Sequence, residues 1–203
     1  DSFGLSYGEL LALSLGGFIA FGAGSLPSGW LGDHWSRHRM MILFFIGMGS
    51  ATMLTGFAST PWQLAAGITA MGVFGSIYHP VGTALLTAHA DKLGQAIGIN
   101  GVWGNLGIAF AALMTGALTQ TFGWQMAFIV PGAVTTLCGV AYWLLVPDVP
   151  SPKRSTARPV SALPRRVVVQ AFAVLAVTTV AGSLGFNATV ISLPKLFDER
   201  LAM

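Results

Sequence analysis

Charged residues are scarce in this sequence: Asp, Glu, Lys and Arg make up 8% of 203 residues, whereas 54% are hydrophobic. An average soluble domain carries roughly 25% charged residues. Four long stretches contain none at all, namely 10–32, 40–90, 93–147 and 167–194. A soluble fold would have to bury all of these stretches at once, so the composition excludes an ordinary soluble domain and indicates a membrane protein.

Reactive side chains are also rare. The single cysteine, Cys138, lies within an apolar stretch, which excludes a disulfide framework. His79 has no Cys or carboxylate inside the same apolar run, no Gly-x-Ser-x-Gly occurs, and hydrolysis at a metal would need at least two more ligands. No enzyme, cofactor or metal site is therefore expected, and nothing indicates the filter of a channel.

The apolar stretches predict a polytopic, all-α helical bundle. A span needs about 20 residues, so the two longest stretches each hold two spans, with turns at Ser59–Pro61 and Thr119–Gly123. Six spans are expected, near 8–31, 40–57, 62–87, 95–119, 124–146 and 167–191. The second and fifth of these (40–57 and 124–146) are expected to be the outer, lipid-facing ones.

The basic residues predict the orientation. Eight of the ten Lys and Arg residues fall in loops of one side, and only Lys195 and Arg200 fall on the other. The positive-inside rule places the first side in the cytoplasm and the N-terminal end outside. The net charge of +3 thus reflects topology, and no nucleic-acid partner is implied.

The segment 148–166, with four prolines and five basic residues, is the expected cytoplasmic linker. It separates 1–147, a first bundle, from 167–203, the start of a second. The chain opens on an outside loop and stops after a span, so we expect an internal piece of a longer protein, in a cell membrane and by expectation the bacterial inner membrane.

The loop GWLGDHWSRHRMM at 29–41 holds an Asp beside a glycine, followed by spaced arginines. It resembles the Gly-x-Leu-Ala-Asp-Arg-x-Gly-Arg-Lys loop of the major facilitator superfamily of secondary transporters. Gly29, Leu31, Asp33 and Arg37 match, whereas His34, Ser36 and His38 replace the family's Arg, Gly and Lys. The His79–Pro80 pair is also similar to the fosmidomycin-resistance type of efflux transporter.

The resemblance implies that the six spans are the family's helices two to seven, and that the absent first helix and second bundle are partners of this chain. It also implies a gating latch, formed by Gly29, Asp33, Arg37 and Arg39, that holds the two bundles together on the cytoplasmic side. A plain loop that only sets topology is the alternative.

The span 62–87, which the resemblance makes the family's fourth helix, carries a polar stripe. At about 100° per residue, one arc holds Thr69, Gly72, Ser76, His79, Thr83 and Thr87. Such a stripe avoids lipid, so Ser76, Tyr78 and His79 are expected on a substrate or proton pathway. Hydroxyls that bond back to their own helix are the alternative. Pro80 should kink or loosen the helix beside His79.

The next span, 95–119, carries a small-residue face, and Gly98, Gly101, Gly104 and Gly107 are expected to permit close packing. Asn105 on this face lies roughly 15 Å deep and His79 roughly 12 Å deep. They could meet one substrate or each other. On the last span Thr179 and Asn187 are weaker candidates for the same pathway.

These features predict a secondary transporter of a small solute that works by alternating access, with proton coupling and efflux as the expected mode. A sensor or assembly factor on the same scaffold, without transport, is the alternative. The lipid bilayer and a small-molecule substrate are the expected partners.

Overall fold

The computed structural model describes residues 3–148 and 164–201, with side chains described as far as Thr189 and again at Ser192. The chain divides into two compact units, Asp1–Pro152 and Lys153–Met203, which are taken separately below. The division falls within the predicted linker, most of which lies outside the described residues.

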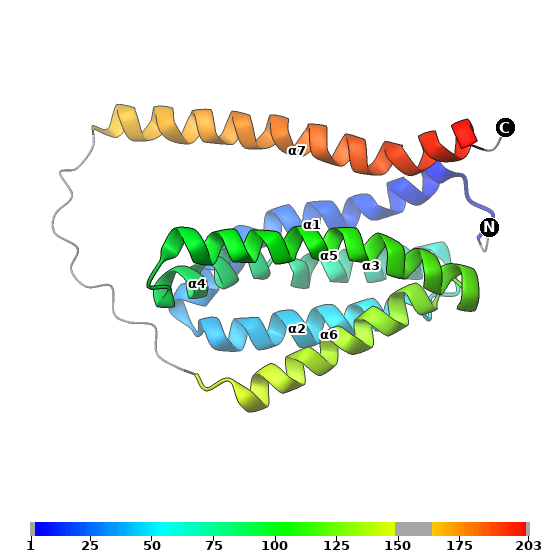
Figure 1. Ribbon diagram of the computed structural model, residues 1–203, viewed down its shortest axis with the longest axis horizontal. Helices are drawn as coiled ribbons and strands as arrows, with labels where there is room; N and C mark the ends of the chain where they lie inside the picture. The colour runs from blue at the N-terminus through cyan, green and yellow to red at the C-terminus, as the bar shows by residue number, and fades with distance from the viewer. Residues whose placement is uncertain (1–2, 149–163, 202–203) are drawn as a thin grey trace. The chain divides into compact units, whose positions relative to one another are not determined.

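Helices make up both units (Figure 1). The first unit contains α1 (Tyr7–His34), α2 (Arg37–Thr55), α3 (Pro61–Gly75), the π-helix η1 (Tyr78–Gly82), α4 (Thr83–His89), α5 (Leu93–Phe122) and α6 (Met126–Leu145). The second unit contains α7 (Arg165–Leu201). The described part of the chain has no strand, which confirms the all-α class.

Five helical segments among the described residues are long and apolar enough to cross a bilayer: Tyr7–His34, Pro61–His89, Leu93–Phe122, Met126–Leu145 and Arg165–Thr189. The sequence predicts six spans. The predicted span that is not among these five is 40–57, which corresponds to α2. This helix has only 19 residues, and it begins with Arg37, His38 and Arg39, which lower its mean hydropathy.

Side chains cap the N-terminal ends of three helices at the expected loops. Ser6 and Glu9 form a capping box at α1, in which Glu9 accepts from the backbone N–H of Ser6 at 2.8 Å. Ser36 accepts from the N–H of Arg39 at α2, and Thr60 accepts from the N–H of Gln63 at α3. The α5–α6 turn uses Gly123 at φ 94°, a conformation that suits glycine.

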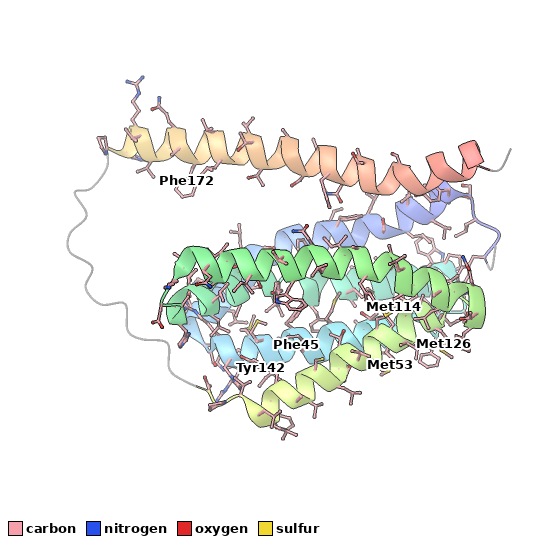
Figure 2. All side chains as sticks on the ribbon, viewed as in Figure 1. Phe45, Met53, Met114, Met126, Tyr142 and Phe172 are labelled. Atoms are coloured by element: carbon pink, nitrogen blue, oxygen red, sulfur yellow. The ribbon has the colours of Figure 1, made fainter. Side chains whose placement is uncertain are left out.

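The first unit is organised around two helix pairs, α1 with α3 and α2 with α6, and α2 also packs against α3. Its hydrophobic core contains Met40 and Met41 of α2, Ile77, and Val81 of η1. Phe45 and Tyr142, labelled in Figure 2, pack against this core from α2 and α6. Seven residues of α2 are buried. The sequence predicts an outer, lipid-facing position for α2. This helix packs against α3 and α6, whereas its Leu43 and Leu54 are exposed, so its position relative to lipid stays a prediction.

Glycines allow the backbones within these pairs to approach closely. A Cβ at Gly72 of α3 would collide with the carbonyl oxygen of Gly17 in α1. A Cβ at Gly132 of α6 would lie 2.8 Å from the carbonyl oxygen of Gly49 in α2. By contrast α5 has no buried residue and contacts mainly α4 and α6. The first unit is therefore closely packed around α1, α2, α3 and α6, while α5 is held more loosely.

Candidate functional site

The helix that carries His79 is interrupted around Pro80. It runs as α3 to Gly75, widens into the π-helix Tyr78–Gly82, and continues as α4 from Thr83. Pro80 has no N–H to donate, and its ring crowds the preceding turn. A π-helix accommodates one extra residue in a turn, and single π turns occur frequently at functional sites.

The π-helix sits against a row of small residues on α1. A Cβ at Gly29 would lie 3.2 Å from the Cβ of Pro80, and a Cβ at Gly32 would lie 2.9 Å from Val81. Between the two helices, the buried hydroxyls of Ser28 and Ser76 are 3.2 Å apart. Gly29, expected in the latch, therefore contacts the segment that carries His79.

The polar stripe of this helix divides at the π-helix. Ser76 is fully buried, and its hydroxyl donates to the carbonyl oxygen of Val73 at 2.6 Å. His79, Thr83 and Thr87 are exposed. A constant angle of about 100° per residue places them all on one face, but the wider π turn changes that angle. Ser76 therefore takes part in the α1–α3 contact, whereas His79 lies on a free surface of the unit.

Two aromatic rings lie beside the imidazole of His79. The ring of Phe21 from α1 meets it edge-on at 6.0 Å, and the ring of Tyr78 lies 5.6 Å away. Tyr78 also packs on Phe44 of α2 at 5.2 Å. One side of the His79 side chain thus contacts aromatic rings, and the other side is exposed.

The hydroxyl of Tyr78 donates to Oδ1 of Asn100 on α5 at 2.9 Å. The sequence pattern points to Asn105 and misses Asn100. The Nδ2 of Asn105 donates to the carbonyl oxygen of Gly101, one turn earlier in its own helix, at 2.8 Å. Polar side chains on apolar helices usually pair, and that signal could have drawn attention to Asn100 as well.

The glycines of α5 have open surroundings. A Cβ at Gly98, Gly101, Gly104 or Gly107 would meet nothing within 4 Å among the described residues. The close packing expected at these positions therefore stays a prediction.

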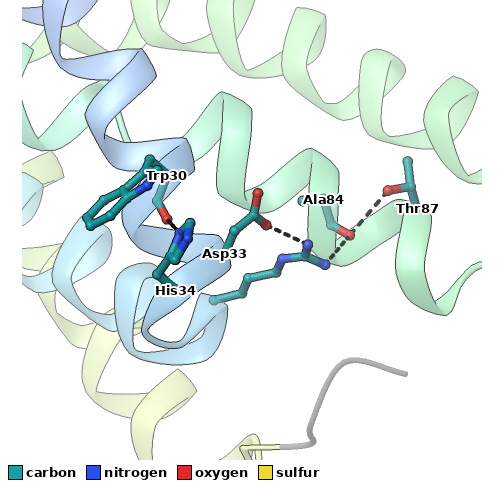
Figure 3. A network of polar contacts seen from close by, with 6 residues as sticks. Trp30, Asp33, His34, Ala84 and Thr87 are labelled. Carbon is teal, nitrogen blue, oxygen red and sulfur yellow. Dashed lines mark hydrogen bonds and ion pairs between the residues drawn. The ribbon is translucent and has the colours of Figure 1, made fainter. Parts of the chain in front are cut away.

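The Asp33–Arg37 pair forms a small network near the ends of three helices (Figure 3). Arg37 Nη2 lies 2.7 Å from Asp33 Oδ1, and the two residues are four positions apart in the sequence. Arg37 Nη1 donates to the carbonyl oxygen of Ala84 on α4 at 3.4 Å, and Thr87 donates to the same oxygen at 3.2 Å. The network thus links the end of α1 and the start of α2 to α4.

Arg39 makes a different contact. Its guanidinium lies 5.8 Å from the ring centre of Trp35, in a cation–π arrangement. His34 likewise turns back onto its own helix, with Nδ1 2.8 Å from the carbonyl oxygen of Trp30. Of the residues expected in the latch, Asp33 and Arg37 are the two that the structure brings together.

The candidates on α7 belong to the second unit. Thr179 and Asn187 are both exposed, and Asn187 Nδ2 donates to the carbonyl oxygen of Ser183 at 2.9 Å. Lys153, Arg154 and Arg158 of the linker lie outside the described residues. Within the described part of the chain, no group of three or more His, Cys, Asp or Glu residues could hold a metal ion.

Comparison with known proteins places these features in a family. The puromycin resistance protein of Streptomyces alboniger is 30% identical over 133 residues, covering 64% of this chain and 26% of the relative. A probable sugar efflux transporter of Helicobacter pylori strain G27 is 25% identical over 161 residues, covering 78% of this chain and 41% of the relative. A probable actinorhodin transporter of Streptomyces coelicolor is 30% identical over 153 residues, covering 70% of this chain and 26% of the relative.

The chain thus spans between 26% and 41% of the length of these relatives. The family model described as the Major Facilitator Superfamily matches residues 1–202, nearly the whole chain. The apolar helices, the Asp33–Arg37 loop and this match agree. The chain belongs to the major facilitator superfamily of transporters and is a multi-pass membrane protein.

Proposed function

We propose that this chain is part of a secondary active transporter that exports a small solute by alternating access, driven by a proton gradient. The observation that carries the proposal is His79, an exposed titratable side chain at a π-helix within a span that has no Asp, Glu, Lys or Arg. The relatives include a puromycin resistance protein, a probable sugar efflux transporter and a probable actinorhodin transporter, which supports export.

His79 suits a role in proton coupling or substrate recognition. A neutral imidazole is far less costly inside a membrane than Lys or Arg, and it can still gain a proton. Pro80 has no N–H to donate, so we propose that a carbonyl of the preceding turn is available to a ligand. The ring of Tyr78 lies 5.6 Å from the imidazole, and its hydroxyl donates to the amide oxygen of Asn100. Asn105, Thr179 and Asn187 are proposed as further pathway residues.

The Asp33–Arg37–Ala84 network is proposed as the gate. It joins α1, α2 and α4 at one end of the unit through an exposed ion pair, which costs little to break. Rocking of one bundle against the other would make and break such contacts. The absent first helix and second bundle of the family would supply the other surfaces.

The proposed topology places the end of the first unit that carries Asp33, Arg37 and Lys92 in the cytoplasm, together with the linker. This arrangement follows the positive-inside rule, and it places the N-terminal end outside a bacterial inner membrane.

Transport by the full-length protein in proteoliposomes tests the proposal, with an imposed proton gradient and buffers near pH 6 and pH 8. His79→Gln keeps hydrogen bonding but cannot titrate, so flux should become independent of pH. His79→Leu should lose transport. His89→Gln is the matched control, because His89 lies at the end of α4 and bonds Leu85.

Two results would contradict the proposal. If both His79 variants transport like the parent at both pH values, His79 is a packing residue. If the parent protein shows no flux of any tested solute at normal expression, a sensor or assembly factor becomes the better description.

A further inference from the structure

A separate pocket lies between the start of α2 and the end of α6. It has a volume of about 400 Å³, and it is lined by His38, Arg39 and Ile42 of α2 and by Trp143 to Asp148 at the end of α6 and just beyond. His79, Tyr78 and Asn100 do not line it. The pocket is therefore distinct from the proposed transport site.

Arg39 is the cation among the residues that line this pocket. It is exposed in the first turn of α2, whereas Arg37 is bound to Asp33. His38 is only 8% exposed, and it stacks on Tyr142 at 5.0 Å. Asp148 also lines the pocket and accepts a hydrogen bond from Ser36 at 3.2 Å. The charged groups of the lining are thus Arg39 and Asp148, with the imidazole of His38 beside them.

The other side of the pocket is apolar and is exposed among the described residues. Trp143, Leu144 and Leu145 are 60%, 71% and 78% exposed. Exposed leucines at the end of a membrane-spanning helix face lipid, and tryptophan prefers the membrane–water interface. A guanidinium within reach of such residues lies at the level of lipid headgroups.

From this combination we propose that the pocket binds an anionic phospholipid of the surrounding membrane. Arg39 pairs with the phosphate, and the acyl chains lie against the apolar wall that begins at Trp143. A single basic side chain near a membrane surface attracts anionic lipid headgroups. A soluble phosphate would leave the apolar wall uncovered. Since Asp148 disfavours a second negative charge, the pocket suits a headgroup with a single one, such as phosphatidylglycerol.

The test counts lipids bound to the purified full-length protein by native mass spectrometry, with phosphatidylglycerol and phosphatidylcholine titrated separately. The parent should retain phosphatidylglycerol selectively. Arg39→Gln should weaken that binding about fivefold, the effect of one basic residue near an anionic lipid surface. Lys92→Gln, which removes an exposed cation outside the pocket, should change it less than Arg39→Gln does.

Asp148→Asn should tighten phosphatidylglycerol binding, because the amide keeps the acceptor for Ser36 and removes the repulsion. Glycerophosphoglycerol, which has the same singly charged headgroup without acyl chains, should not displace the lipid at equal concentration. Equal retention of both lipids, or unchanged binding by Arg39→Gln, would overturn the proposal. Equal competition by glycerophosphoglycerol would show a site for soluble phosphates and would equally overturn it. Because these readouts do not involve flux, they are independent of the proposed transport.

Discussion

At Gly72 the contact between α1 and α3 depends on the absence of a side chain. A Cβ there would collide with the backbone carbonyl of Gly17, which cannot rotate away. Gly72→Ala should therefore destabilise the protein by about 1–3 kcal/mol, as overpacking does. Thermal unfolding in detergent should show a lower Tm.

Gly75→Ala is the matched control for this change. Its Cβ would lie 3.4 Å from a ring atom of Phe21, an ordinary contact with a side chain that can move. Equal Tm values for the two variants would mean that α1 and α3 separate more easily than their spacing indicates.

Asp33 is expected to matter for transport more than for stability. Its side chain is 59% exposed, and exposed ion pairs contribute about 0–1 kcal/mol. Asp33→Asn should lower the flux of the full-length protein while expression and Tm stay close to those of the parent. Flux equal to that of the parent at matched expression would make Asp33 a residue that only sets topology.

The candidate site is predictable from the sequence in part. The residue types and spacing around His79 draw attention to this segment, because a histidine beside a proline is unusual in an apolar span. The partner of Tyr78 is not predictable in the same way, since the choice between Asn100 and Asn105 depends on how α5 lies against η1. Helical periodicity describes one helix alone and contains no such information.

Helix α5 is held to the rest of its unit in part by the hydrogen bond from the Tyr78 hydroxyl to Asn100. A neutral hydrogen bond contributes about 1 kcal/mol. Tyr78→Phe should therefore let α5 move more freely, and amide hydrogen exchange near Asn100 should become several times faster.

Thr115→Val is a control for this variant, because the Thr115 hydroxyl bonds carbonyls of α5 itself. Equal exchange of the parent and Tyr78→Phe would show that contacts of α5 with α4 and α6 suffice to hold it.

Helix positions are largely predictable, because charges and capping residues mark the ends of apolar runs. Ser36 and Thr60 start α2 and α3 where charged or turn-forming residues interrupt the apolar sequence. The division of the 62–87 span into α3, η1 and α4 is not predicted beyond a loosening at Pro80. The packing of α2 against both α3 and α6 is not predicted either, since the hydrophobicity of a membrane helix does not distinguish a lipid-facing side from a packed one.

For the whole molecule, the proposed topology can be tested with single cysteines in a background that lacks Cys138. Lys92→Cys and Ser59→Cys place thiols at exposed positions at opposite ends of the bundle. An impermeant reagent added to intact cells should label Ser59→Cys and leave Lys92→Cys unmodified. Labelling in the reverse pattern would invert the orientation, and permeabilised cells should expose both.

The π-helix also has a consequence for the length of the polypeptide. Because the wide turn holds one residue more than an α-helical turn, a chain without Val81 could form an uninterrupted helix. Because the wide turn takes up the extra residue locally, the helix after the deletion should keep its orientation relative to α3. The carbonyl of Ala84 should stay near Arg37, whereas Gly32 would lose the side chain of Val81 that packs against it. A single deletion here should thus leave the two ends of the span in place, and sequence alignments of this segment should place a one-residue gap at the π-helix for relatives that lack it.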